Sequence, residues 1–99
     1  MRVAPPPPPV VSGEQAAIKG KITPPYYYSD HLRLYMFASY NKIEYKFIMK
    51  FSSPVLYRKV RKYIFNNRNK KIVVSGVWHD DGTHAFRTDI TDAGQVVAE

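Results

Sequence analysis

The stretch IVVSGVWHDDGTHAFRTDI, residues 72–90, decides how the rest of the chain can be arranged. Two runs rich in β-branched and aromatic residues, 72–78 and 84–90, flank Asp80-Asp81-Gly82. An Asp-Gly pair can take the positive φ angles that a tight turn between antiparallel strands needs, so the stretch predicts a β-hairpin. Gly76 lies inside the first run, where a glycine indicates a bend, a bulge or a close approach of another backbone. A small closed barrel requires such features.

Three strands and a helix are predicted before this hairpin. Alternating apolar and polar residues favour strands over Ala16–Ile22, His31–Ser39 and Ile43–Phe51. A helix should begin at Ser53-Pro54, with the serine as N-cap, and should end at Asn66-Asn67, because asparagine tolerates the left-handed conformation that ends helices. Five strands with one helix between the third and fourth is the order of an OB-fold. We therefore expect an all-β fold with one helix, a five-stranded Greek-key barrel.

The 99 residues are enough for one domain with a modest core. We expect the barrel to occupy residues 14–92 and residues 93–99 to form a short tail. Residues 1–13 contain five consecutive prolines and should form a disordered, extended arm. A solubilising tail or spacer explains this arm more simply than a ligand for an SH3- or WW-like groove.

The composition also excludes several classes of protein. The chain has no cysteine, so it can form neither a disulfide framework nor a thiolate metal site. No apolar run approaches the length of a membrane span, and the N-terminus lacks the long apolar core of a secretory signal. We therefore expect a cytoplasmic protein that has no membrane partner.

Basic and aromatic residues are both abundant. The chain has 15 Lys and Arg against 8 Asp and Glu, and Glu44 is the only acid between Lys42 and Lys71. It also carries 8 Tyr, 5 Phe and 1 Trp, more rings than a small core needs. A well-solvated basic surface would explain the charge alone. Cations interleaved with rings instead favour a groove for single-stranded nucleic acid, in which cations contact the backbone and rings stack on the bases.

The sequence gives little support for a metal site or for an enzyme active site. His79, Asp80, Asp81 and His84 have metal-like spacing, but a turn also favours Asp and Gly here, and no further nitrogen or thiolate ligand supports a metal site. No glycine-rich phosphate loop and no identifiable serine-histidine-acid arrangement occurs in the sequence. We expect a protein that is not an enzyme, with no cofactor and no small-molecule substrate.

Several motifs, in order, resemble those of the bacterial single-stranded DNA-binding proteins and the related primosomal OB-fold proteins. The resemblance covers Ile18–Ile90. Its motifs are Gly20-Lys21-Ile22-Thr23 followed by Pro25, Glu44-Tyr45, Phe51, Val74-Ser75-Gly76, Trp78-His79-Asp80-Asp81-Gly82 and Phe86-Arg87-Thr88-Asp89-Ile90. Two features depart from the family: Gly76 and Trp78 lie closer together, and the glycine- and proline-rich linker with its acidic tip is missing after Ile90.

The resemblance implies binding of single-stranded DNA with little sequence preference, and assembly into a homo-dimer or homo-tetramer. It also implies stacking on Tyr45 and Phe51, with Trp78 and Tyr40 as further candidates. The residue pattern conflicts with part of this, because Tyr45 and Phe51 share a strand face with apolar residues while the other face carries charges that are costly to bury. Trp78 likewise aligns with apolar neighbours. The sequence leaves open whether these three rings face the groove or the core.

The candidate site residues follow from both arguments. The candidate stacking residues are Tyr35, Phe37, Tyr45, Phe51, Tyr40, Trp78, Tyr26, Tyr27 and Tyr28. The candidate phosphate-binding residues are Arg33, Lys42, Lys46, Lys50, Arg58, Lys62, Lys71 and Arg87.

The leading functional hypothesis is protection of single-stranded DNA during replication, recombination or repair. Two alternatives remain: an OB-fold module that binds proteins and uses the proline-rich arm as a tether, and an OB-fold that binds RNA.

Overall fold

Six strands, one α-helix and one short 3₁₀ helix make up the described part of the chain, residues 8–22 and 32–99 of a computed structural model. The elements are β1 (Glu14–Gly20), β2 (Arg33–Tyr40), β3 (Ile43–Phe51), α1 (Pro54–Asn66), β4 (Ile72–Asp80), β5 (Ala85–Ile90), η1 (Ala93–Gln95) and β6 (Val96–Ala98). Neither of these helices is long and apolar enough to cross a membrane.

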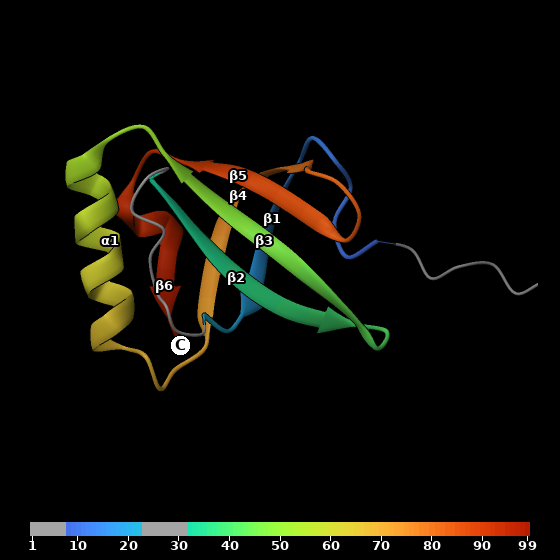
Figure 1. Ribbon diagram of the computed structural model, residues 1–99, viewed down its shortest axis with the longest axis horizontal. Helices are drawn as coiled ribbons and strands as arrows, with labels where there is room; N and C mark the ends of the chain where they lie inside the picture. The colour runs from blue at the N-terminus through green and yellow to red at the C-terminus, as the bar shows by residue number, and fades with distance from the viewer. Residues whose placement is uncertain (1–7, 23–31) are drawn as a thin grey trace, which may run out of the picture.

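The strands follow the order β1-β4-β5-β3-β2, in which β3 and β5 run parallel and the other pairs run antiparallel. The backbone of Lys21, just after β1, exchanges two hydrogen bonds of 2.9 Å with that of Phe37 on β2. This bridge brings the two ends of the sheet together, so the sheet curls into a barrel (Figure 1). α1 connects β3 to β4, as the order of the elements predicts. The expectation of an OB-like barrel with one helix is confirmed.

Two glycines allow elements of the barrel to approach closely. A Cβ atom at Gly20 would lie only 2.5 Å from the carbonyl oxygen of Phe37, so a side chain here would push β1 away from β2. A Cβ atom at Gly76 would collide with the hydroxyl of Thr88 on β5. That hydroxyl is buried and donates a 2.8 Å hydrogen bond to the carbonyl of Val77. The glycine inside β4 therefore makes room for a side chain of β5, whereas the sequence predicts a bend, a bulge or a close approach of another backbone there.

The predicted hairpin is present but short. β4 and β5 are antiparallel, yet only His79 and Asp80 pair with β5, opposite Arg87 and Phe86. The remainder of β4 pairs with the whole of β1 along one edge, and β6 pairs with Ile72–Val74 along the other. The turn contains Gly82 at φ 109°, as predicted for a hairpin turn.

The core fills the inside of the barrel and the space beneath α1. Trp78 lies at its centre, where the ring packs edge-on against Phe47 at 5.2 Å and its Nε1–H donates to the carbonyl of Ala16 at 3.1 Å. The apolar face of α1 packs against this core through Tyr57, Val60 and Ile64. The core residues come from every strand of the barrel, so its stability depends on the closed arrangement.

The ends of α1 lie where the sequence predicts them. The Ser53 hydroxyl accepts a 3.2 Å hydrogen bond from the N–H of Leu56, which confirms the N-cap. At the other end Asn67 is the C-cap, but its φ of −121° is not left-handed. Instead, its side-chain amide donates to the carbonyl of Tyr63 at 2.8 Å. The predicted helix end is confirmed, whereas the predicted backbone conformation is wrong.

The chain ends contribute more to the barrel than the sequence predicts. Val10 is buried in the core cluster, and the N–H of Gly13 donates to the carbonyl of Trp78 at 2.7 Å, so residues 8–13 are not a disordered arm. Residues 1–7 lie outside the described residues. The tail after residue 92 is also part of the fold, since β6 pairs with β4 and the Gln95 amide donates to the carbonyl of Ser75 at 2.9 Å.

Candidate nucleic-acid interface

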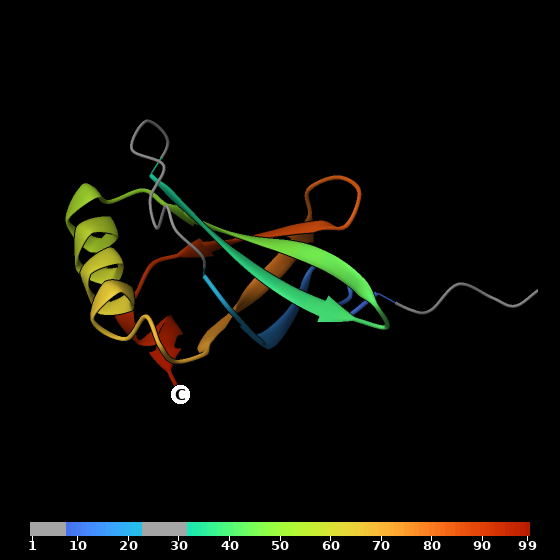
Figure 2. The same ribbon diagram turned by 60° about the horizontal axis from the view of Figure 1, so that its bottom comes forward.

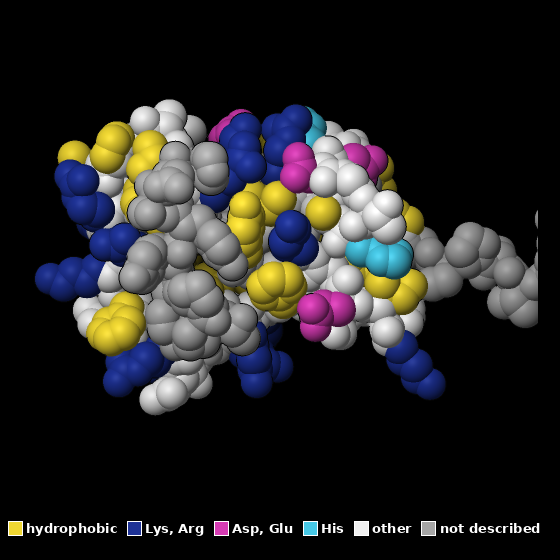
Figure 3. All heavy atoms as spheres, in the orientation of Figure 1, with side chains coloured by type: hydrophobic (Ala, Val, Ile, Leu, Met, Phe, Trp, Pro, Cys, Tyr) yellow, Lys and Arg dark blue, Asp and Glu magenta, His cyan; other side chains and the backbone are white. Residues whose placement is uncertain are grey.

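The outward sides of β2, β3 and β5 form one continuous surface, which we call the β2–β3 face. Its accessible residues are Arg33, Tyr35, Phe37, Lys46, Lys50 and Arg87, whereas Ile48, on the same side of β3, is only 3% exposed. They alternate along each strand with inward residues such as Leu34, Met36, Phe47 and Met49, which are fully buried. In Figure 3, Lys and Arg side chains lie beside hydrophobic side chains over these strands.

Rings and cations are paired across this face by the strand register. Arg33 lies opposite Lys50, Tyr35 opposite Ile48, and Phe37 opposite Lys46. The Lys46 ammonium also reaches diagonally to within 5.0 Å of the Tyr35 ring centroid, a cation–π contact. Tyr35 and Phe37 are partly buried, so each ring is supported from below while part of it reaches solvent. The arrangement can hold a planar ligand on the rings and an anion on the neighbouring cations.

The far side of the face is less positive. Arg87 on β5 lies opposite Ile48, but its Nε is 3.5 Å from an oxygen of Asp81. Asp89, opposite Lys50, is exposed on the same strand. Among the described residues, the positive charge of the β2–β3 face therefore centres on Arg33, Lys46 and Lys50.

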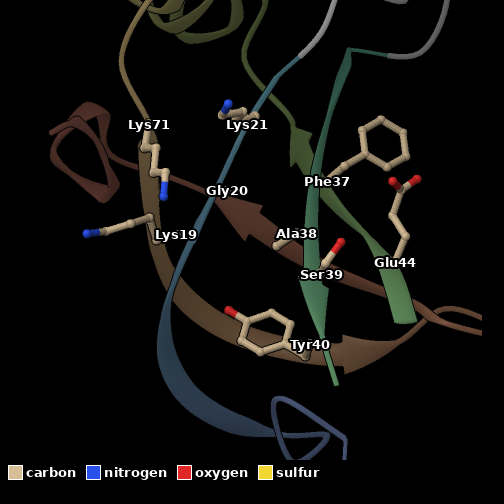
Figure 4. A pocket seen from close by; sticks show the side chains of 9 residues that line it. All are labelled: Lys19, Gly20, Lys21, Phe37, Ala38, Ser39, Tyr40, Glu44 and Lys71. Atoms are coloured by element: carbon tan, nitrogen blue, oxygen red, sulfur yellow. The ribbon is translucent and has the colours of Figure 1, made fainter. Parts of the chain in front are cut away.

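A groove of about 430 Å³ opens beside β2, where β1 and β2 diverge beyond the Lys21–Phe37 bridge. We call it the seam groove; its lining residues are Lys19, Gly20, Lys21, Phe37, Ala38, Ser39, Tyr40, Glu44 and Lys71. Figure 4 shows the three lysines on the β1 side, with Phe37 and Glu44 across from them. Lys19 is already paired with Glu99 at 2.8 Å. Because Phe37 belongs to both surfaces, the seam groove continues the β2–β3 face around the barrel.

Three of the candidate stacking rings lie in the core. Tyr45 and Phe51 are each only 6% exposed, and Trp78 is fully buried. Tyr45 packs among Phe47, Phe86 and the imidazole of His84. The physical reason is the alternation of β3: turning its rings outward would bury Glu44, Lys46 and Lys50. Their assignment to a stacking surface is therefore corrected to a core role.

The other candidates are distributed over several surfaces. Tyr40 ends β2 and packs edge-on against Tyr45 at 6.2 Å, while part of it lines the seam groove with Lys71. Lys42 is exposed in the turn between β2 and β3. Arg58 and Lys62 are exposed on α1, which covers one end of the barrel, so they do not join the β2–β3 face (Figure 2). Tyr26, Tyr27 and Tyr28 lie outside the described residues.

Three residues near this surface are absent from the sequence-based candidates. Lys19 and Lys21 line the seam groove, and the outward alternation of the first strand was the signal that could have suggested them. His84 is exposed in the loop between β4 and β5, with its imidazole 5.2 Å from the Tyr45 ring. In OB-folds the loop between β4 and β5 borders the binding face, so the place of His84 in that loop could have suggested it as a site residue.

Within residues 8–22 and 32–99, no three His, Asp or Glu side chains gather closely enough to hold a metal ion.

The chain was also compared with known proteins. Neither a family model, nor a curated protein, nor a solved structure matches it. The fold assignment therefore rests on the strand order and pairing described above.

Proposed function

We propose that this protein binds single-stranded DNA in the cytoplasm, with little sequence preference, along the β2–β3 face. It would act there as a binding protein that covers DNA during replication, recombination or repair, and not as an enzyme. The observation that carries the proposal is the register that sets Tyr35 and Phe37 among Arg33, Lys46 and Lys50. The resemblance to the bacterial single-stranded DNA-binding family points the same way.

Each part of this face matches one part of a single strand. A base can stack on Tyr35 or Phe37 whatever its identity, because every base has a π-face. A cation lies opposite or diagonal to each ring, where it can meet the phosphate that follows the stacked base. Neither contact reads the hydrogen-bonding edge of a base, so little sequence preference is expected.

The seam groove extends the surface along which the DNA strand can bind. A strand that stacks on Phe37 can turn around the edge of β2 toward Lys21 and Lys71, which line the groove with that ring. Glu44 lies on the same side as Phe37 and favours a route that keeps phosphates close to β1. The site would then extend from Arg33 to Lys71.

The proposal predicts a salt-dependent affinity, measured by the anisotropy of a labelled oligo-dT. If Arg33, Lys46 and Lys50 each neutralise one phosphate, log affinity should fall with log salt with a slope of about −2, or roughly 20-fold between 50 and 200 mM salt, and further contacts to Lys21 and Lys71 would steepen the slope to about −3.5. Duplex DNA of the same length should bind more weakly, because its bases are not free to stack. Absence of binding at 50 mM salt, or an affinity that salt leaves unchanged, would contradict the proposal.

The same titration separates DNA from RNA. An oligo-U competitor matched in length to the oligo-dT should compete less well if DNA is the preferred ligand. Tighter binding of the RNA would assign the β2–β3 face to RNA, since the stacking and phosphate contacts serve both acids, and the two oligomers differ in the 2′-hydroxyl and in the C5 methyl group of thymine.

A further inference from the structure

A second groove lies at the end of the barrel between α1 and the C-terminal segment. Its lining is mainly apolar, whereas that of the seam groove is basic. We call it the helix groove; its lining residues are Lys59, Val60, Tyr63, Ala93, Gly94, Val96 and Val97, and its volume is about 330 Å³. Val60 and Val96 are buried, whereas Tyr63 is 38% and Val97 48% exposed. The groove thus has an apolar base and two partly exposed apolar residues beside it.

The position of this groove is fixed by contacts among its own elements. The Tyr63 hydroxyl accepts a 2.8 Å hydrogen bond from the N–H of Ala98, which joins α1 to β6. Asp92 caps η1, and Gln95 anchors η1 to β4 through the carbonyl of Ser75. Figures 1 and 2 both show η1 and β6 beside α1. A groove held in this way is ready for a ligand without rearrangement.

The surroundings of the groove are strongly positive. α1 carries four cations and no acid, and no Asp or Glu occurs anywhere from residue 45 to residue 79. Lys59 lines the groove, and Lys62, one turn further along α1, is exposed. Of the acids on the neighbouring segment, Glu99 pairs with Lys19, and Asp92 accepts a hydrogen bond from the N–H of Gly94, so one carboxylate lies at the edge of the groove.

We propose that the helix groove binds an acidic peptide through one bulky apolar side chain. The apolar side chain would enter between Tyr63 and Val97 and rest on Val60 and Val96. Carboxylates on either side of it would meet Lys59 and Lys62. A central apolar anchor surrounded by polar contacts is the usual anatomy of a peptide-binding site.

The lining of the groove favours a peptide over nucleic acid. Lys59 is the only charged side chain among the lining residues, so the groove favours a ligand that inserts an apolar side chain over one that is charged along its whole length. The groove shares no residue with the β2–β3 face or the seam groove. A peptide bound here would leave those surfaces free, so the same chain could hold a partner protein and single-stranded DNA together.

The test uses the full chain and three labelled eight-residue peptides. The first has a central Phe-Leu pair between aspartates, the second has two serines in place of that pair, and the third has lysines in place of the aspartates. The first should bind, and the other two should bind at least about tenfold more weakly, since each loses one of the two contributions. A saturating amount of oligo-dT should leave binding of the first peptide unchanged.

Matched variants locate the site. Val97→Asp should weaken binding of the first peptide about tenfold, whereas Val77→Asp, at a 40% exposed valine on β4, should have no such effect. Lys59→Glu should weaken binding about fivefold, and Lys42→Glu, in the β2–β3 turn, should not. The lysine pair keeps the test decisive if Val97→Asp disturbs β6.

Four results would overturn the proposal. The first is no binding of the Phe-Leu peptide, and the second is equal binding of the serine peptide. The third is displacement of the peptide by oligo-dT, which would assign it to the nucleic-acid surface. The fourth is self-association of the chain that Val97→Asp abolishes, which would assign the groove to a second copy. The first, second and fourth results do not depend on whether oligo-dT binds. An oligo-dT that fails to bind would count against the proposed function alone.

Discussion

Replacing Tyr35 or Phe37 by alanine is expected to weaken oligo-dT binding by about 1–3 kcal/mol each, or roughly 5- to 150-fold, while the protein stays folded. Each variant removes one stacking ring from the β2–β3 face. Both rings lie on the outward side of β2 and are partly buried, so their loss leaves the barrel core intact. Tyr35→Ala also removes the cation–π partner of Lys46, whereas Tyr35→Phe should keep both the stacking and this contact.

The matched control is Phe65→Ala, which removes a ring that is 50% exposed on α1. It should leave oligo-dT affinity within about twofold, because surface substitutions away from the site have small effects. Anisotropy titrations at low salt measure the affinities, and circular dichroism checks the fold. If Phe65→Ala weakens binding as much as the β2 variants do, or if the β2 variants bind normally, stacking on β2 is wrong.

Replacing Trp78 by phenylalanine should lower the free energy of unfolding by about 2–4 kcal/mol and leave oligo-dT affinity unchanged. The smaller ring creates a cavity beside Phe47 and leaves the carbonyl of Ala16 without the indole N–H. Urea unfolding measures the loss, with Val77→Thr on the exposed side of β4 as the control, which should change stability by less than about 0.5 kcal/mol.

This variant also separates two roles for the tryptophan. The family resemblance makes Trp78 a candidate for stacking on DNA, whereas the ring is fully buried. If Trp78→Phe loses much of its affinity for oligo-dT but little stability, the Trp78 ring contacts DNA. A loss of stability alone supports its role in the core.

The parts of the fold that depend on local sequence could be predicted. The alternation along β3, the Ser53 cap and the glycine of the β4–β5 turn each act within a few residues, and each occurs where expected. The choice of strand partners depends on residues far apart in the chain. β4 pairs mainly with β1, and β6 is only three residues long, too short to give a periodic signal. Its position depends on Gln95, whose amide reaches a carbonyl of β4.

The candidate site could be predicted only in part. The phosphate candidates Arg33, Lys46 and Lys50 do share one face, because alternation along a strand is a local property. Tyr45 and Phe51 could not be assigned from the sequence, since a bulge in β3 would have turned one of them outward. β3 runs without interruption from Ile43 to Phe51, so both rings stay inside. The helix groove depends on how the C-terminal segment docks on α1, which no local pattern indicates.

The most direct test of the central claim is amide chemical-shift mapping by NMR during titration with oligo-dT. The account predicts the largest shifts in β2, β3 and the seam groove, led by the amides of Tyr35, Phe37 and Lys46, with α1 and η1 unperturbed. Shifts concentrated on α1 around Arg58 and Lys62, with β2 unchanged, would contradict it.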